Sequence, residues 1–191
     1  MLWVVLAINV AIFVAEFGAG VWADSTALQG DSLDSLGDAL VYGLSLVVLG
    51  RSLRARAGAA LVKGGIQLGF AGAVLAEVLH KLIAGSEPLP AVMAAAAGLA
   101  LIANITCLAL LTRFRGDDIN MRSVWLCSRN DVIGNVGVLL TTVLIAWSGW
   151  RWLDLAFGAG LAVLFLRTGI EVLGTAWPQF RPRTGALSRE P

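Results

Sequence analysis

The stretch that decides the fold is GDSLDSLGDALVYG, residues 30–43. It places three aspartates, Asp31, Asp34 and Asp38, at helical spacings of three and four residues. At about 100° per residue, the three side chains fall within an arc of roughly 60° on one helix face. The chain around them is strongly apolar, with a mean hydropathy of +0.80. A helix that carries a stripe of carboxylates through such a chain needs something to compensate the charge.

Composition places the chain among integral membrane proteins. Of its 191 residues, 58% are hydrophobic and 14% are charged, whereas a soluble domain has roughly a quarter charged residues. The net charge of +1 argues against nucleic acid as a partner. The first apolar run lacks a basic leader, so we expect a retained helix rather than a signal peptide. We therefore expect an all-α integral membrane protein.

Hydropathy along the chain predicts the number of helices. A bilayer core of about 30 Å requires about 20 apolar residues per helix. On this measure, residues 1–176 form one domain of six transmembrane helices, and residues 177–191 form a short, disordered cytoplasmic tail. The predicted helices are Leu2–Trp22, Ala27–Gly50, Val62–Ala84, Ala91–Thr112, Ser123–Ser148 and Trp152–Gly174.

The basic residues predict the orientation. Lys and Arg gather around the connections that follow the second and fourth helices and in the tail, whereas only Lys81 and Arg151 mark the other side. An excess of Lys and Arg marks cytoplasmic loops. We therefore expect a multi-pass protein of the cell (inner) membrane, with both termini in the cytoplasm.

The fifth predicted helix repeats the polar spacing of the second. Cys127 and Asp131 are four residues apart, and Asn135 continues the same stripe. Two facing helices that each offer two ligands, one turn apart, can present four donors to one divalent ion. The ion would also neutralise carboxylates that each cost about 2.5–3.5 kcal/mol in a membrane helix. The predicted metal ligands are Asp34, Asp38, Cys127 and Asp131, and the accessory candidates are Asp31 and Asn135.

Simpler interpretations of the same residues stay open. Asp31 could cap its helix or serve an outer mouth. The two carboxylates deeper in that helix could form structural ion pairs with Arg129 or Arg167. Cys127 alone would be a small buried hydrophobe more often than a ligand. Its assignment depends wholly on its spacing from Asp131.

Two stretches resemble the cation diffusion facilitator family, DSTALQGDSLDSLGD at 24–38 and CSRNDVIGN at 127–135. That family carries a [His/Asp]-x-x-x-Asp pair on its second helix, here Asp34 and Asp38, and another on its fifth, here Cys127 and Asp131. The resemblance covers the six-helix region and implies export of divalent metal, most often zinc, in exchange for protons. It also implies a homodimer that works by alternating access. The metal is cargo, so we expect neither a permanently bound cofactor nor an enzyme.

The chain departs from the family pattern in two ways. Cys127 stands where the family has His or Asp, and a thiolate favours zinc, cadmium or another thiophilic ion. A protonated thiol would instead leave a harder site that suits iron, cobalt or manganese. We also expect a short form without the usual cytoplasmic metal-binding domain, which puts regulation by metal sensing in doubt.

Two other functional classes compete with a transporter. The Gly-x-x-x-Asp-x-x-x-Asp spacing that ends at Asp38 also fits half of the CDP-alcohol phosphotransferase signature, whose aspartates bind metal. The other half, Asp-Gly-x-x-Ala-Arg, is missing, because Glu16 and Gly20 stand where Asp and Ala are required. A non-transporting membrane scaffold or metal sensor is the second alternative.

Overall fold

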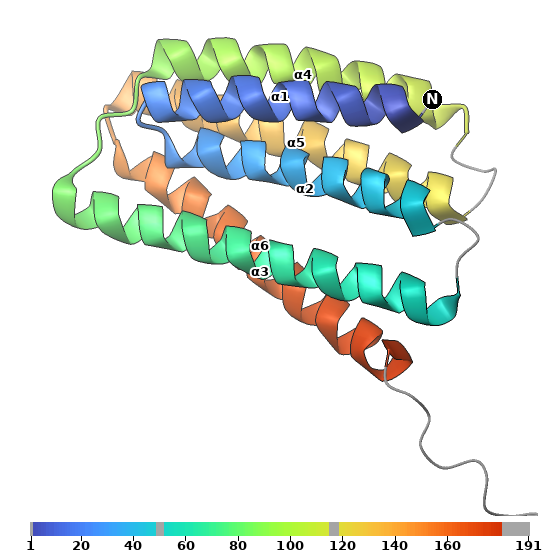
Figure 1. Cartoon of the computed structure of the whole chain (residues 1–191). Helices are drawn as coiled ribbons and strands as arrows, with labels where there is room; N and C mark the ends of the chain where they lie inside the picture. The colour runs from blue at the N-terminus through green and yellow to red at the C-terminus, as the bar shows by residue number, and fades with distance from the viewer. Residues whose placement is uncertain (1, 49–51, 115–118, 181–191) are drawn as a thin grey trace, which may run out of the picture.

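The structure is a computed structural model that describes residues 2–48, 52–114 and 119–180 (Figure 1). Within these ranges the chain forms six helices and no strand. The helices are α1 (Leu2–Trp22), α2 (Thr26–Val48), α3 (Leu53–Ala84), α4 (Pro90–Thr112), α5 (Ile119–Ser148) and α6 (Trp152–Phe180).

The helices pack as three pairs, and α2 contacts members of all three. Helix α1 packs along α2, α4 packs along α5, and α3 crosses α6 below them in the view of Figure 1. Helix α2 also contacts α3, α5 and α6. The carboxylate-bearing helix therefore lies inside the assembly, between the α4–α5 pair and the α3–α6 pair.

The surface of the bundle suits a lipid environment. Five helices are long and apolar enough to cross a membrane, namely α1, α3, α4, α5 and α6. They expose large apolar side chains such as Leu140, at 60%, and Val143, at 63%. Among the described helices, α2 falls outside this group because its carboxylates lower its hydropathy, and its neighbours surround it. The expectation of an all-α membrane protein is confirmed.

Glycines set the approach of α3 to α6. A Cβ atom added at Gly169 would stand 2.8 Å from Cδ2 of Leu68 and 3.1 Å from the carbonyl oxygen of Gly64. A Cβ added at Gly64 would stand 2.8 Å from Cγ of Leu173. Only a residue without a Cβ fits at these contacts. Small residues bring membrane helices together in this way.

Two helices start well before the predicted boundaries, whereas α2 and α4 start one residue early. Helix α3 begins at Leu53 rather than Val62, and α5 begins at Ile119 rather than Ser123. The side chain of Ser52 caps α3 by accepting a hydrogen bond of 3.3 Å from the Ala55 amide. Hydropathy missed this extension because it measures transfer into lipid, and Arg is a good helix former outside the apolar core.

Helix α6 also runs past its predicted end. It continues to Phe180 rather than Gly174, beyond the predicted domain limit at 176. The Arg54 guanidinium lies 5.3 Å from the centroid of the Phe180 ring, so the two helix extensions pack on each other. Packing between elements, which hydropathy does not measure, accounts for the extra length. The remaining part of the predicted tail, 181–191, lies outside the described residues.

Candidate metal site

Asp38 is a predicted ligand whose carboxylate accepts a side-chain hydrogen bond. It lies on α2 and is 8% exposed. The Tyr42 hydroxyl, one turn further along α2, donates a hydrogen bond of 2.9 Å to its Oδ2. The Cys127 thiol of α5 interacts electrostatically with the carboxylate. Asp38 and Cys127 are therefore neighbours across the α2–α5 interface.

Asp131 lies beside this pair on α5. It is 3% exposed, and its Oδ2 is buried without a hydrogen-bond partner among the residues that the structure describes. It interacts electrostatically with Asp38 and Asp34. Asp34 is half-buried and interacts in turn with Asp38. Electrostatic interactions thus link the four predicted ligands across the two helices.

The group is not a closed coordination shell. Within 2–48, 52–114 and 119–180, no three His, Cys, Asp or Glu side chains stand close enough together to hold a metal ion. Asn135 is buried, and its Nδ2 donates a 3.0 Å hydrogen bond to the Asp131 backbone carbonyl, while its Oδ1 has no partner within these ranges. In this conformation the predicted ligands are neighbours that would have to converge on an ion.

Asp31 does not lie at the start of α2, where a helix cap would be. It is 3% exposed and lies more than one turn inside α2. Its Oδ1 faces α5, because a Cβ added at Gly134 would stand 2.5 Å from it. The interpretation as a helix cap is therefore wrong, and the interpretation as an outer mouth stays a prediction. Because Gly134 has no Cβ, the Asp31 carboxylate can lie directly against α5.

The arginine partners that we considered are elsewhere. Arg129 is exposed and lies over the Trp125 ring, 5.7 Å from its centroid, and Arg167 is exposed on α6. The cation that interacts electrostatically with both Asp34 and Asp38 is Lys63 of α3. Sequence reasoning assigned Lys63 to the cytoplasmic basic cluster and missed this role, because nothing local links α3 to α2.

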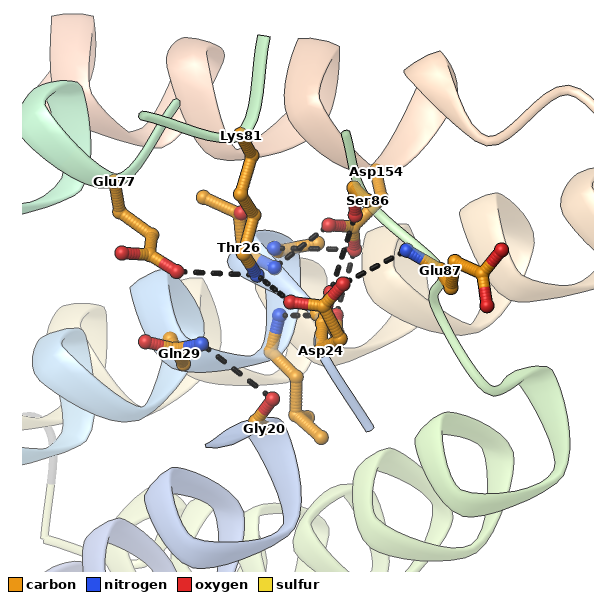
Figure 2. A network of polar contacts seen from close by, with 12 residues as sticks. Gly20, Asp24, Thr26, Gln29, Glu77, Lys81, Ser86, Glu87 and Asp154 are labelled. Carbon is orange, nitrogen blue, oxygen red and sulfur yellow. Dashed lines mark hydrogen bonds and ion pairs between the residues drawn. The ribbon is translucent and has the colours of Figure 1, made fainter. Parts of the chain in front are cut away.

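A second polar group lies at the opposite end of α2 (Figure 2). Asp154 of α6 is fully buried and accepts hydrogen bonds from the Ser25 hydroxyl and the Thr26 amide, both 2.6 Å long, and from the Ala27 amide at 3.2 Å. Sequence reasoning missed Asp154. The available signal was an ionisable side chain at the third position of a predicted transmembrane helix.

Lys81 forms ion pairs at the same end of the bundle. Lys81 Nζ lies 2.8 Å from Asp24 Oδ1 and 3.2 Å from Glu77 Oε1. Burial alone would raise the pKa of Asp24, but its hydrogen bonds and ion pair with Lys81 and its bond to the Glu87 amide outweigh burial. The pKa of Asp24 is therefore lowered from its ordinary value of 3.8. Asp24, in the connection between α1 and α2, thus contacts both α3 and the α3–α4 connection.

Comparison with known proteins identifies the domain. Residues 2–177 match the family described as the cation efflux transmembrane domain. The chain belongs to the cation efflux family. The match covers α1 to α5 and nearly all of α6, and it is to a transport domain, so it lends no support to the phosphotransferase interpretation.

This cation efflux domain is similar in sequence to three relatives. The metal cation efflux system protein CzcD of Cupriavidus metallidurans is 26% identical over 186 residues, which cover 91% of this chain and 57% of the relative. The zinc transporter ZitB of Yersinia pestis is 26% identical over 90% of this chain and 59% of its own length. A cadmium, cobalt and zinc/H(+)-K(+) antiporter of Bacillus subtilis is 36% identical over 56 residues, 29% of this chain and 18% of its own. The chain thus spans less than two thirds of each relative.

Proposed function

We propose that the chain exports divalent metal cations, zinc above all, across the cell (inner) membrane in exchange for protons. Asp34, Asp38, Cys127 and Asp131 are the proposed ligands, with Asp31 and Asn135 as accessory residues. The observation that carries the proposal is that Asp38 of α2 interacts electrostatically with both Cys127 and Asp131 of α5. Family membership and the names of the relatives support the same substrate class.

Competition for the same oxygens accounts for the exchange. A carboxylate binds a metal ion only when it is ionised, so a bound metal displaces protons and bound protons displace metal. If the ligand set alternates between the two sides, metal leaves and protons return. We propose a homodimer with both termini in the cytoplasm, the side on which the exposed Arg54 and Arg56 of α3 would lie.

Transport in reconstituted vesicles tests the proposal. We expect Zn²⁺-driven proton counterflow in the wild type, and a loss of at least about 100-fold in Asp38→Ala and in Asp131→Ala, because each removes a direct ligand. Glu171→Ala, which removes an exposed carboxylate of α6, is the matched control and should keep the wild-type rate. Full flux in both ligand variants would show that the metal passes elsewhere, and no flux in the wild type would favour a scaffold or sensor.

The metal preference tests the role of Cys127. We expect the uptake ranking of Zn²⁺, Cd²⁺, Co²⁺ and Mn²⁺ to shift away from Cd²⁺ in Cys127→Ser, because a hydroxyl is a harder donor than a thiolate. Cys127→His should restore a zinc-favouring ranking. An unchanged ranking across all three proteins would remove Cys127 from the ligand set.

A further inference from the structure

Asp154 holds the first turn of α2 from a helix that is distant in sequence. The first residues of an α-helix have amide groups without intrahelical partners, and these carry the positive end of the helix dipole. Asp154 accepts hydrogen bonds from two of these amides, those of Thr26 and Ala27, and from the Ser25 hydroxyl. The Ser25 Oγ in turn accepts a 3.1 Å bond from the Leu28 amide. One carboxylate thus satisfies three consecutive amides, directly or through Ser25 (Figure 2).

The rest of the same α6 face fixes how α2 lies against it. A Cβ added at Gly158, one turn after Asp154, would stand 2.7 Å from Cγ2 of Thr26. A Cβ added at Gly30 would stand 3.0 Å from Cδ1 of Leu161. The contacts at 154, 158 and 161 follow helical spacing, so α6 contacts α2 along its first turns. Neither a rotation nor a slide of α2 preserves both the hydrogen bonds and these close contacts.

This anchor lies on the helix that carries half of the proposed metal site. Asp34 is eight residues beyond Thr26, about 12 Å along the axis at 1.5 Å per residue. The intervening helix contains Asp31, whose Oδ1 lies against Gly134 of α5. A change in the axial position of α2 therefore moves its carboxylates relative to Cys127 and Asp131. Ligand groups lose function when displaced by about 1 Å.

We propose that Asp154 is a positioning residue for the metal site: its hydrogen bonds to the start of α2 set the axial position and rotation that bring Asp34 and Asp38 opposite the α5 ligands. The proposal rests on the proposed transport function. It assigns to Asp154 an effect on metal affinity, beyond the stability that a helix cap supplies.

The first test is Asp154→Asn, with Glu171→Gln as the matched control, the same kind of amide replacement at an exposed position of α6. In detergent, hydrogen exchange of the Thr26 and Ala27 amides should be faster by about tenfold in Asp154→Asn, because a charged acceptor is lost. In vesicles, its apparent KM for Zn²⁺ should be higher by about tenfold, while the maximal rate per folded molecule stays within about twofold. The control should match the wild type in both measurements.

The readouts separate positioning from a structural role. Faster exchange with an unchanged KM would overturn the proposal, since it would make Asp154 a cap only, and unchanged exchange would overturn it as well. Ser25→Ala keeps the test valid if Asp154→Asn does not fold. It removes the Ser25 hydroxyl, and with it both the bond to Asp154 and the bond from the Leu28 amide, but it keeps the two bonds from backbone amides to Asp154. We therefore expect a rise of about threefold in KM, and no rise would count against positioning. Failure of the transport function itself would appear separately, as flux retained in Asp38→Ala.

Discussion

Asp131 and Asp154 are similarly buried carboxylates in neighbouring helices, with 3% and 0% of their surface exposed, yet their surroundings differ completely. Asp154 accepts three hydrogen bonds at the start of α2. The Oδ2 of Asp131 has none from the described part of the chain, and its neighbours Asp38 and Asp34 carry the same charge. A carboxylate whose hydrogen-bond partners all lie in the protein contributes to structure. A carboxylate that has an oxygen without a hydrogen-bond partner and lies near other carboxylates is available for a cation.

Stability should separate the two carboxylates most strongly. We expect Asp154→Ala to lower the free energy of unfolding by about 3 kcal/mol, because it leaves buried amides without an acceptor. Asp131→Ala should change it by less than about 1 kcal/mol, since Oδ2 has no hydrogen-bond partner to lose among the described residues. Denaturation in detergent measures both. Equal losses in the two variants would remove the distinction between a structural carboxylate and an available one.

Tyr42 tests whether the hydrogen bond to Asp38 orients a ligand. In Tyr42→Phe the 2.9 Å bond is lost while the ring is kept. We expect the apparent affinity for Zn²⁺ to fall by about tenfold, as for other groups that orient metal ligands. Zn²⁺ titration of the purified protein measures it, with Phe165→Leu as a buried aromatic control away from Asp38. Wild-type affinity in Tyr42→Phe would mean that the hydroxyl does not orient the carboxylate.

Lys63 tests the electrostatics of the site from outside the ligand set. Its positive charge acts on Asp34 and Asp38 and opposes an incoming cation. Lys63→Gln should therefore raise the apparent affinity for Zn²⁺ by about threefold at low salt, and less at high salt. Arg129→Gln removes an exposed cation and serves as the control. Weaker binding in Lys63→Gln would show that the lysine supports the carboxylates rather than competing with the metal.

The Asp24–Lys81 pair should give the smallest effect and a defined pH dependence. The pKa of Asp24 is lowered in the folded protein, so the pair contributes fully above the ordinary value of 3.8 and is lost as the pH falls through the lowered pKa. The contribution should be about 0.5 kcal/mol, because the Asp24 side chain is 42% exposed and solvent screens the pair. Unfolding of wild type and Asp24→Asn between pH 6 and 3 should converge at the acid end. A constant difference would contradict the assignment.

Much of the fold could be predicted because its signals are local. Hydropathy located all six helices, and the start of α1 and the ends of α1, α3, α4 and α5 agree with the structure. The extensions of α3 and α6 were missed, because Arg54 packs on Phe180 and hydropathy does not measure such contacts. The spacing within each ligand pair predicted that its two members would share a helix face. Asp38 interacts electrostatically with Cys127 and Asp131, and the ligand set itself stays a prediction.

The sequence by itself determined the membrane class, the helix number and the residues that carry ionisable groups, because these follow from composition and from a repeat of 3.6 residues. Only the tertiary structure decided which groups have partners. It placed Asp154 beside residues 127 to 129 positions away, buried Asp31 against Gly134, and brought Lys63 into electrostatic interaction with the carboxylates of α2. The physical reason is that helix approach depends on which glycines face which side chains across the interface, and no local pattern encodes that match.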